Sequence, residues 1–133
     1  MFNDELRTRS FNLSIQVILF LREIADNQES KILKAQLIRS VTSVAANFRA
    51  ACVSRSKQEW YSKMSIVVEE ADEVVFWLEL FENLNLIKGN AFAELKSEAL
   101  ELVKIFSKSR GKLTNKYYLC DPNYYYIGNN ISF

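Results

Sequence analysis

One cluster of carboxylates stands out in the chain as a group that could do chemistry. Residues 69–73 have the sequence EEADE, and Glu69 and Glu73 share a helix face at a spacing of four. Di-metal centres in helix bundles use such carboxylates, but they also take histidine from two helices. The chain contains no histidine. We therefore interpret the cluster as a solvated helix face that pairs with bases on a neighbouring helix, and we expect no metal and no cofactor.

Composition excludes most other catalytic sites. Without histidine, a Ser-His-Asp triad, a Cys-His nucleophile and an H-E-x-x-H zinc site are impossible. The glycines, Gly89, Gly111 and Gly128, are too dispersed for a P-loop or a dinucleotide-binding turn. Cys52 and Cys120 form no C-x-x-C motif and are expected to be free thiols in a reducing cytoplasm. We expect no catalytic residue and a protein that is not an enzyme.

Apolar residues at helical spacing predict four helices, over about 4–25, 31–54, 57–85 and 91–110. Ser30, Ser56 and Asn90 are the expected N-caps, and Gly111 is the expected C-terminal stop. The third helix carries an unbroken heptad-type seam, made of Trp60, Met64, Val67, Ala71, Val74, Leu78 and Phe81. Short connections then predict an all-α fold, an antiparallel up-down-up-down four-helix bundle over residues 1–112.

The two termini need separate interpretations. Residues 11–21 are apolar but too short to span a bilayer, so we expect a buried helix of a cytoplasmic protein, not a membrane anchor. Residues 113–133 form an aromatic C-terminal tail that holds five of the six tyrosines. We expect this tail to lie across its own bundle or a neighbour's; the alternatives are a base-stacking arm for nucleic acid and disorder.

More apolar surface is present than one bundle can bury. A bundle needs one apolar stripe per helix, yet the first and third helices carry large apolar residues on further faces. The candidate positions for covering this surface with a second copy are Ile18, Phe76, Trp77 and Leu80. We expect a homo-oligomer; coverage by the tyrosine-rich tail is the alternative.

Charge is arranged along the bundle although the total is only +1. Residues 28–55 hold five bases and one acid, and residues 56–88 hold three bases and seven acids, which favours pairing between the second and third helices. One end gathers Arg7 and Arg9 with the candidate nucleic-acid-binding residues Arg49, Arg55, Lys57, Lys104, Lys108, Arg110 and Lys112. Bases at helix C-termini complement the helix dipole; the functional alternative is a rim that binds RNA or DNA phosphates.

In the second helix, Asn47 lies among small residues. Small side chains let its backbone approach a neighbour closely, and a buried amide there must find partners. Acidic groups on the third helix are the expected acceptors, and a solvent-facing Asn47 is the alternative.

A set of positions between Gln36 and Ile87 follows a family pattern. They are Gln36, Leu37, Arg39, Ser43, Val44, Asn47, Arg55, Ser56, Glu59, Trp60, Glu70, Glu73, Trp77, Leu78, Glu79 and Leu80. In these positions the chain resembles the four-helix-bundle family named for proteins encoded in 23S ribosomal RNA intervening sequences. Ala45 replaces the family's usual proline, and Ala50 replaces its usual acid three residues after the asparagine. The chain therefore lacks the acid of that asparagine–acid pair.

The resemblance implies a bundle that assembles as a homopentameric barrel, and it carries no implication of a catalytic activity. Related accessory proteins of diversity-generating retroelements form basic barrels that bind nucleic acid and a reverse transcriptase. We therefore expect a non-enzymatic binding or scaffold module that self-assembles and is RNA- or DNA-associated through its basic end. A scaffold for a partner protein, without nucleic acid, is the alternative.

Overall fold

The computed structural model describes residues 2–87 and 89–113, with side chains as far as Gly111. The predicted tyrosine-rich tail lies outside the described residues, except for Leu113, which is the last residue of a helix.

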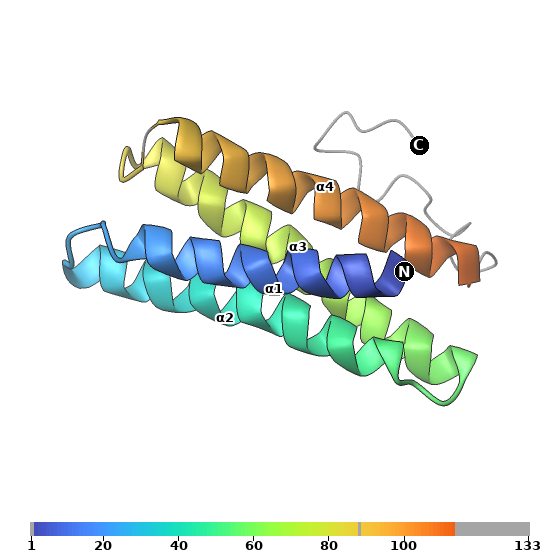
Figure 1. Ribbon diagram of the computed structural model, residues 1–133. Coiled ribbons are helices and arrows are strands. Elements are labelled where there is room, and N and C mark those ends of the chain that lie inside the picture. Colours follow the sequence, from blue (N-terminus) through green and yellow to red (C-terminus); the bar gives the residue numbers. More distant parts are fainter. Residues whose placement is uncertain (1, 88, 114–133) are drawn as a thin grey trace.

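Four α-helices account for nearly all of the described chain. They are α1 (Phe2–Leu21), α2 (Gln28–Cys52), α3 (Lys57–Asn83) and α4 (Asn90–Leu113), and no strand occurs in the described residues. Successive helices run in opposite directions, so the start of α1, the end of α2, the start of α3 and the end of α4 gather at one end (Figure 1). The predicted all-α four-helix bundle is confirmed.

The helices surround one core in the order of the chain. α1 packs on α2, α2 on α3, α3 on α4, and α4 on α1. It follows that α1 and α3 lie diagonally across the bundle, as do α2 and α4. The outer faces of α1 and α3 therefore point to opposite sides of the molecule.

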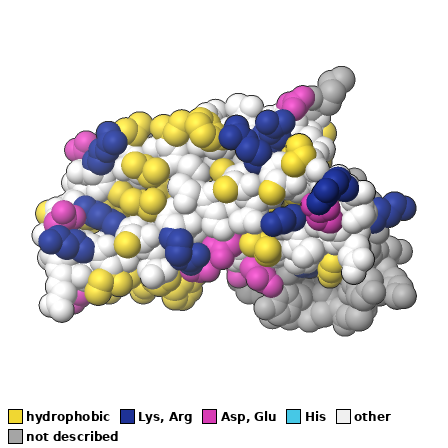
Figure 2. All heavy atoms as spheres, turned by 90° about the horizontal axis from the view of Figure 1, so that it is seen from below, with side chains coloured by type: hydrophobic (Ala, Val, Ile, Leu, Met, Phe, Trp, Pro, Cys, Tyr) yellow, Lys and Arg dark blue, Asp and Glu magenta, His cyan; other side chains and the backbone are white. Residues whose placement is uncertain are grey.

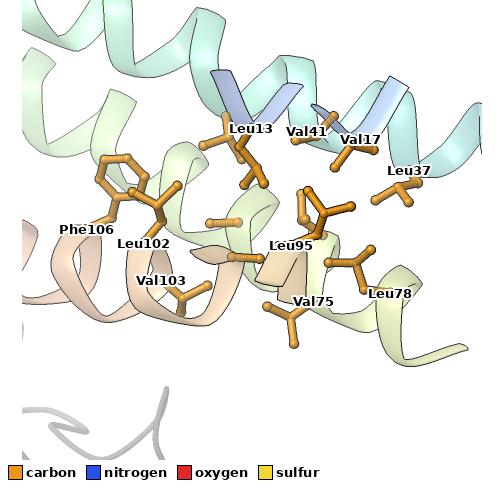
Figure 3. Close-up of a cluster of buried hydrophobic side chains, with 14 of the residues drawn as sticks. Leu13, Val17, Leu37, Val41, Val75, Leu78, Leu95, Leu102, Val103 and Phe106 are labelled. Atoms are coloured by element: carbon orange, nitrogen blue, oxygen red, sulfur yellow. The ribbon is translucent and has the colours of Figure 1, made fainter. Parts of the chain in front are cut away.

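The core is one cluster of buried apolar side chains to which all four helices contribute. Side chains from all four helices, among them Leu13, Val41, Leu78 and Leu102, point into the space between the helices (Figure 3). The predicted seam of α3 is buried from Met64 to Phe81, with exposed fractions of 0–4%. Only Trp60, in the first turn, is half-buried. The spacing along α3 therefore predicted the buried face correctly.

Two helix starts differ in how well they were predicted. Ser56 caps α3 as expected, because its Oγ accepts a hydrogen bond from the Glu59 N–H at 3.0 Å. The prediction of Ser30 as the cap of α2 is wrong, and Asn27 caps this helix instead. Asn27 Oδ1 accepts from the Ser30 N–H and Ser30 Oγ accepts from the Asn27 N–H, both at 2.8 Å. Ser30 is thus the third helical residue of a reciprocal capping box.

The start and end of α4 also correct the sequence predictions. The Gly89 carbonyl accepts the hydrogen bond from the Ala93 N–H, so Asn90 is the first helical residue and not the cap. Gly111 does not stop the helix, which continues to Leu113. A glycine inside a helix costs only about 1 kcal/mol relative to alanine, an amount that packing of the surrounding turns can offset.

α3 ends before the predicted residue 85, in a Schellman motif. The Leu86 N–H donates to the Phe81 carbonyl and the Asn85 N–H donates to the Glu82 carbonyl. Asn85 is left-handed, with φ of 57°, a conformation that favours glycine. α1 likewise ends at Leu21, about four residues before the predicted end, although Ile24 still packs on the core.

Candidate functional site

The carboxylate cluster on α3 is divided between two surroundings. Glu70 and Glu73 lie beside α2, where they pair with Arg39, whereas Glu69 and Asp72 are exposed. Protein atoms next to the Asp72 carboxylate displace part of its water, and this desolvation raises the pKa of the carboxyl although the residue is exposed. Residues 2–87 and 89–113 contain no group of three His, Cys, Asp or Glu side chains placed to hold a metal ion.

Arg39 is the centre of a hydrogen-bonded network between α2 and α3. Its Nη1 lies 3.1 Å from Glu70 Oε2, its Nη2 donates to Glu73 Oε1, and its Nε donates to Gln36 Oε1 at 3.2 Å. Trp77 Nε1 donates to the same Glu73 oxygen at 3.1 Å. The hydrogen bond from Arg39 to Glu73 and the two nearby negative charges raise the pKa of the Arg39 guanidinium, which stays charged at any working pH.

The network joins five of the family-pattern positions, Gln36, Arg39, Glu70, Glu73 and Trp77. The predicted pairing of a basic α2 with an acidic α3 is confirmed in Arg39, Glu70 and Glu73. Arg55, Ser56 and Glu59 belong to the start of α3, where the Glu59 carboxylate accepts from the Arg55 N–H at 3.3 Å. The Arg39 contacts join α2 to α3, and the contacts of Ser56 and Glu59 cap the start of α3.

Asn47 does not meet the acidic partner that the sequence led us to expect. Its Nδ2 donates to the carbonyl and the Oγ of Ser43, at 2.9 and 3.0 Å, one turn earlier on α2. The expectation of an α3 acceptor is therefore wrong, because a half-buried amide on a helix reaches its own preceding turn more easily than the next helix.

The basic end exists, but its charges do not share a face. Arg49, Arg55, Lys57, Lys104 and Lys108 are exposed. They belong to the end of α2, the connection from α2 to α3, the start of α3 and the last turns of α4, which meet at this end of the bundle (Figure 1). Because α2 and α4 are diagonal, the bases on these two helices lie on different sides of the bundle. Seen from below Figure 1, blue groups are scattered among white and yellow ones and form no continuous track (Figure 2).

Some bases at this end already have partners within the bundle. Arg110 lies over the Tyr61 ring, 5.8 Å from its centroid. Arg9 crosses from α1 to α4, where its Nε and Nη2 bind both oxygens of Glu98 and its Nη2 also binds Glu101 at 2.7 Å. Arg9 therefore adds little free positive charge to this end. The side chain of Lys112, another candidate, lies outside the described residues.

The candidate interface residues lie on two opposite sides of the bundle. On α3, Phe76 is 54% exposed and meets the edge of Trp77 at 4.9 Å between ring centroids. Trp77 and Leu80 are half-buried and pack partly on the core. Ile18 is half-buried on α1, which is diagonal to α3. The structure thus separates Ile18 from the other three candidates.

Around Ile18, α1 presents a row of apolar side chains that the candidate set left out. The row is formed by Phe11, Ile15 and Leu19, which are 54%, 42% and 49% exposed. Their spacing of four residues was visible in the sequence as one further helix face.

A groove beside this row, between α1 and α2, was also missed. It has a volume of about 280 Å³ and is lined by Arg7, Phe11, Ser14, Thr42, Ala45, Ala46 and Arg49. Below it, Ser14 Oγ donates to the Val41 carbonyl at 3.0 Å, which joins the two helices. The small residues of α2 were the sequence signal for this groove, but they indicated close packing and not an open surface.

Comparison with known proteins places the chain by sequence and by fold. The family described as "23S rRNA-intervening sequence protein" matches residues 3–108. The chain belongs to this family. A solved structure from Bacteroides thetaiotaomicron VPI-5482, described as a protein with unknown function from the S23 ribosomal protein family, matches with a TM-score of 0.75. The match covers 83% of this chain and 98% of that one at 23% sequence identity, so it supports the family's fold.

No curated protein matches the chain. Neither the family description nor the Bacteroides structure names an enzymatic activity. Among the described residues, no helix has the length and apolar character that crossing a lipid bilayer requires.

Proposed function

We propose that this family member is a non-enzymatic module that self-assembles and acts by binding another macromolecule. The observation that carries the proposal is the exposure of large apolar side chains on two diagonal helices. Phe11 on α1 and Phe76 on α3 are each 54% exposed. Large exposed apolar groups clustered on a helix face mark interaction surfaces more often than isolated ones do.

Two different faces on opposite sides favour a closed ring. An isologous dimer uses one patch twice, whereas a head-to-tail contact uses two different patches and closes into a ring when the rotation allows it. Five subunits is the number that the family resemblance implies, and we propose a pentamer on that basis.

The mass of the protein in solution tests self-assembly. We expect native mass spectrometry and light scattering to give a multiple of the 15.5 kDa chain mass, with five copies as the main species. A mass of 15.5 kDa at every concentration up to about 100 µM, where contacts of micromolar affinity are occupied, would overturn the proposal.

RNA or DNA is the macromolecule that the basic end favours. Exposed Lys104 and Lys108 lie one turn apart on α4, and in a ring this pair is repeated once per subunit. Repetition turns weak phosphate contacts into useful avidity.

Binding of a fluorescent single-stranded RNA and the matching DNA at 50 mM salt tests the nucleic-acid role. We expect the double variant K104E/K108E to lose binding and R22E/K31E, which changes two exposed bases at the opposite end, to retain it. Equal binding by both variants would exclude the basic end as the site.

The alternative is a scaffold for a partner protein without nucleic acid. It is favoured by the apolar lining of the α1–α2 groove, which suits a protein side chain better than a phosphate. Absence of RNA and DNA binding, together with co-purification of the protein encoded beside its gene, would replace the nucleic-acid role with this one.

A further inference from the structure

We propose that the groove between α1 and α2 receives the outer face of α3, around Phe76, from a second copy of the chain. The inference rests on the self-assembly proposed above and names the two surfaces that meet. It is carried by the matching apolar character and opposite charge of these surfaces.

The groove combines an apolar wall with positive charge at one end. Phe11, Ala45 and Ala46 supply apolar surface, and Arg7 and Arg49 lie at the basic end of the bundle. Arg7 forms an ion pair with Asp4 on its own helix, with 3.6 Å between Arg7 Nη1 and Asp4 Oδ1. Arg49 is exposed and forms no ion pair with any residue in the described part of the chain, so it is available to an incoming carboxylate.

The α3 face combines an apolar protrusion with negative charge. Phe76 is 54% exposed and is held by its edge contact with Trp77. Asp72 lies four residues before Phe76 and Glu79 three residues after it, so both carboxylates share its face. Both are exposed, and neither forms an ion pair with a residue in 2–87 or 89–113.

These two surfaces cannot meet within one molecule. α1 and α3 are diagonal, and the groove and Phe76 open on different sides of the bundle. Contact therefore requires two copies, and each copy offers its groove to one neighbour and its Phe76 face to the other. This head-to-tail arrangement is the kind that closes into rings. The groove volume of about 280 Å³ suits an inserted aromatic side chain rather than a whole helix.

A complementation experiment distinguishes this contact from any other. Phe76→Ser removes the protrusion and Ala46→Trp fills the groove; both positions are exposed, and both variants are expected to retain the helical circular dichroism of the parent. We expect each variant alone to be a monomer by native mass spectrometry. Mixed in equal amounts, they have one intact groove and one intact protrusion between them, and we expect a heterodimer and nothing larger. Ile32→Ser, which removes a 59% exposed side chain elsewhere, is the control that should keep the parent mass.

Charge reversal tests the same contact without changing its shape. We expect Arg49→Glu to weaken assembly by about tenfold, and Asp72→Lys or Glu79→Lys in the same chain to restore at least half of the loss. This second readout applies even if Ala46→Trp fails to fold.

The outcomes separate this inference from the proposed function. A monomeric parent chain would overturn self-assembly itself. A parent that assembles, with Phe76→Ser and Ala46→Trp of unchanged mass, would overturn the groove contact and leave self-assembly standing. Loss of assembly on deletion of residues 114–133, with Ala46→Trp unaffected, would assign the contact to that segment and also overturn it.

Discussion

Replacing Arg39 by alanine removes the centre of the network between α2 and α3. Arg39 is about half exposed, with a side-chain exposure of 48%, while Glu70 and Glu73 are 18% and 33% exposed. A single exposed ion pair contributes about 0.2–1 kcal/mol, and paired geometry in a network places the value at the upper end. We therefore expect Arg39→Ala to lower the free energy of unfolding by about 1 kcal/mol.

Glu73 has a second role that makes its loss more costly. Its Oε1 accepts hydrogen bonds from both Arg39 and Trp77. Glu73→Ala leaves the half-buried indole N–H without its acceptor, which adds about 1 kcal/mol to the loss of the ion pair. Glu73→Gln keeps an oxygen for Trp77, and we expect it to cost about 1 kcal/mol less than Glu73→Ala.

A double-mutant cycle measured by urea unfolding checks this reasoning. At fixed protein concentration, we expect a coupling energy of about 1 kcal/mol between Arg39→Ala and Glu73→Ala at low salt. It should fall by half or more in 1 M NaCl, where the Debye length is about 3 Å. Lys31→Ala, an exposed cation on the same helix, is the control and should change stability by less than about 0.5 kcal/mol. Additive effects, with coupling below about 0.3 kcal/mol, would refute the view that this network joins the helices.

Three further predictions test local features of the structure. Asn85→Gly should raise the free energy of unfolding by about 0.5–1 kcal/mol because glycine adopts the left-handed φ of 57° without a Cβ penalty, and a destabilised variant in urea unfolding would contradict the Schellman motif. Ser107→Ala should leave the free energy of unfolding unchanged or raise it by up to about 1 kcal/mol, because the buried Ser107 hydroxyl has no hydrogen-bond partner among the described residues. A clear fall in the free energy of unfolding, measured in urea, would show that the hydroxyl has a partner. Burial raises the pKa of the Cys52 thiol, so less of it is thiolate at a given pH. In a Cys120→Ser background, the rate at which Cys52 reacts with a disulfide reagent should rise with pH and reach half its maximum above the free-thiol pKa of about 8.5. A half-maximal rate at or below this pH would contradict the buried environment.

Local patterns predicted the elements of the fold because they depend on neighbours in the chain. The spacing of Met64, Val67 and Leu78 identified the buried face of α3, and Ser56 with Glu59 identified its start. Caps failed where two residue types competed. Asn27 and Ser30 both suit a helix start, and the choice between them depends on how the preceding turn packs, with Ser30 Oγ donating to the Ala25 carbonyl at 2.9 Å.

The candidate site was predicted only in part. Charge counts indicated that α2 pairs with α3, and the family pattern grouped Arg39, Glu70 and Glu73, but neither showed that they share one network with Trp77. Arg9 was assigned to a basic end, yet Glu98 and Glu101, about ninety positions away along the chain, take up its charge. Contacts of this kind depend on the offset between two helices, which no periodicity within one helix specifies.

By itself, the sequence determined that this protein is a bundle of four helices, which face of α3 is buried, and that no catalytic site dependent on histidine can form. Helical periodicity and residue chemistry are properties of short segments, so they could be recognised without coordinates. Only the tertiary structure decided that Phe11 and Ala46 form the wall of one groove while Phe76 faces the other side. The reason is that side-chain packing in the shared core sets the rotation and axial offset of each helix, and every residue in the core contributes to them at once.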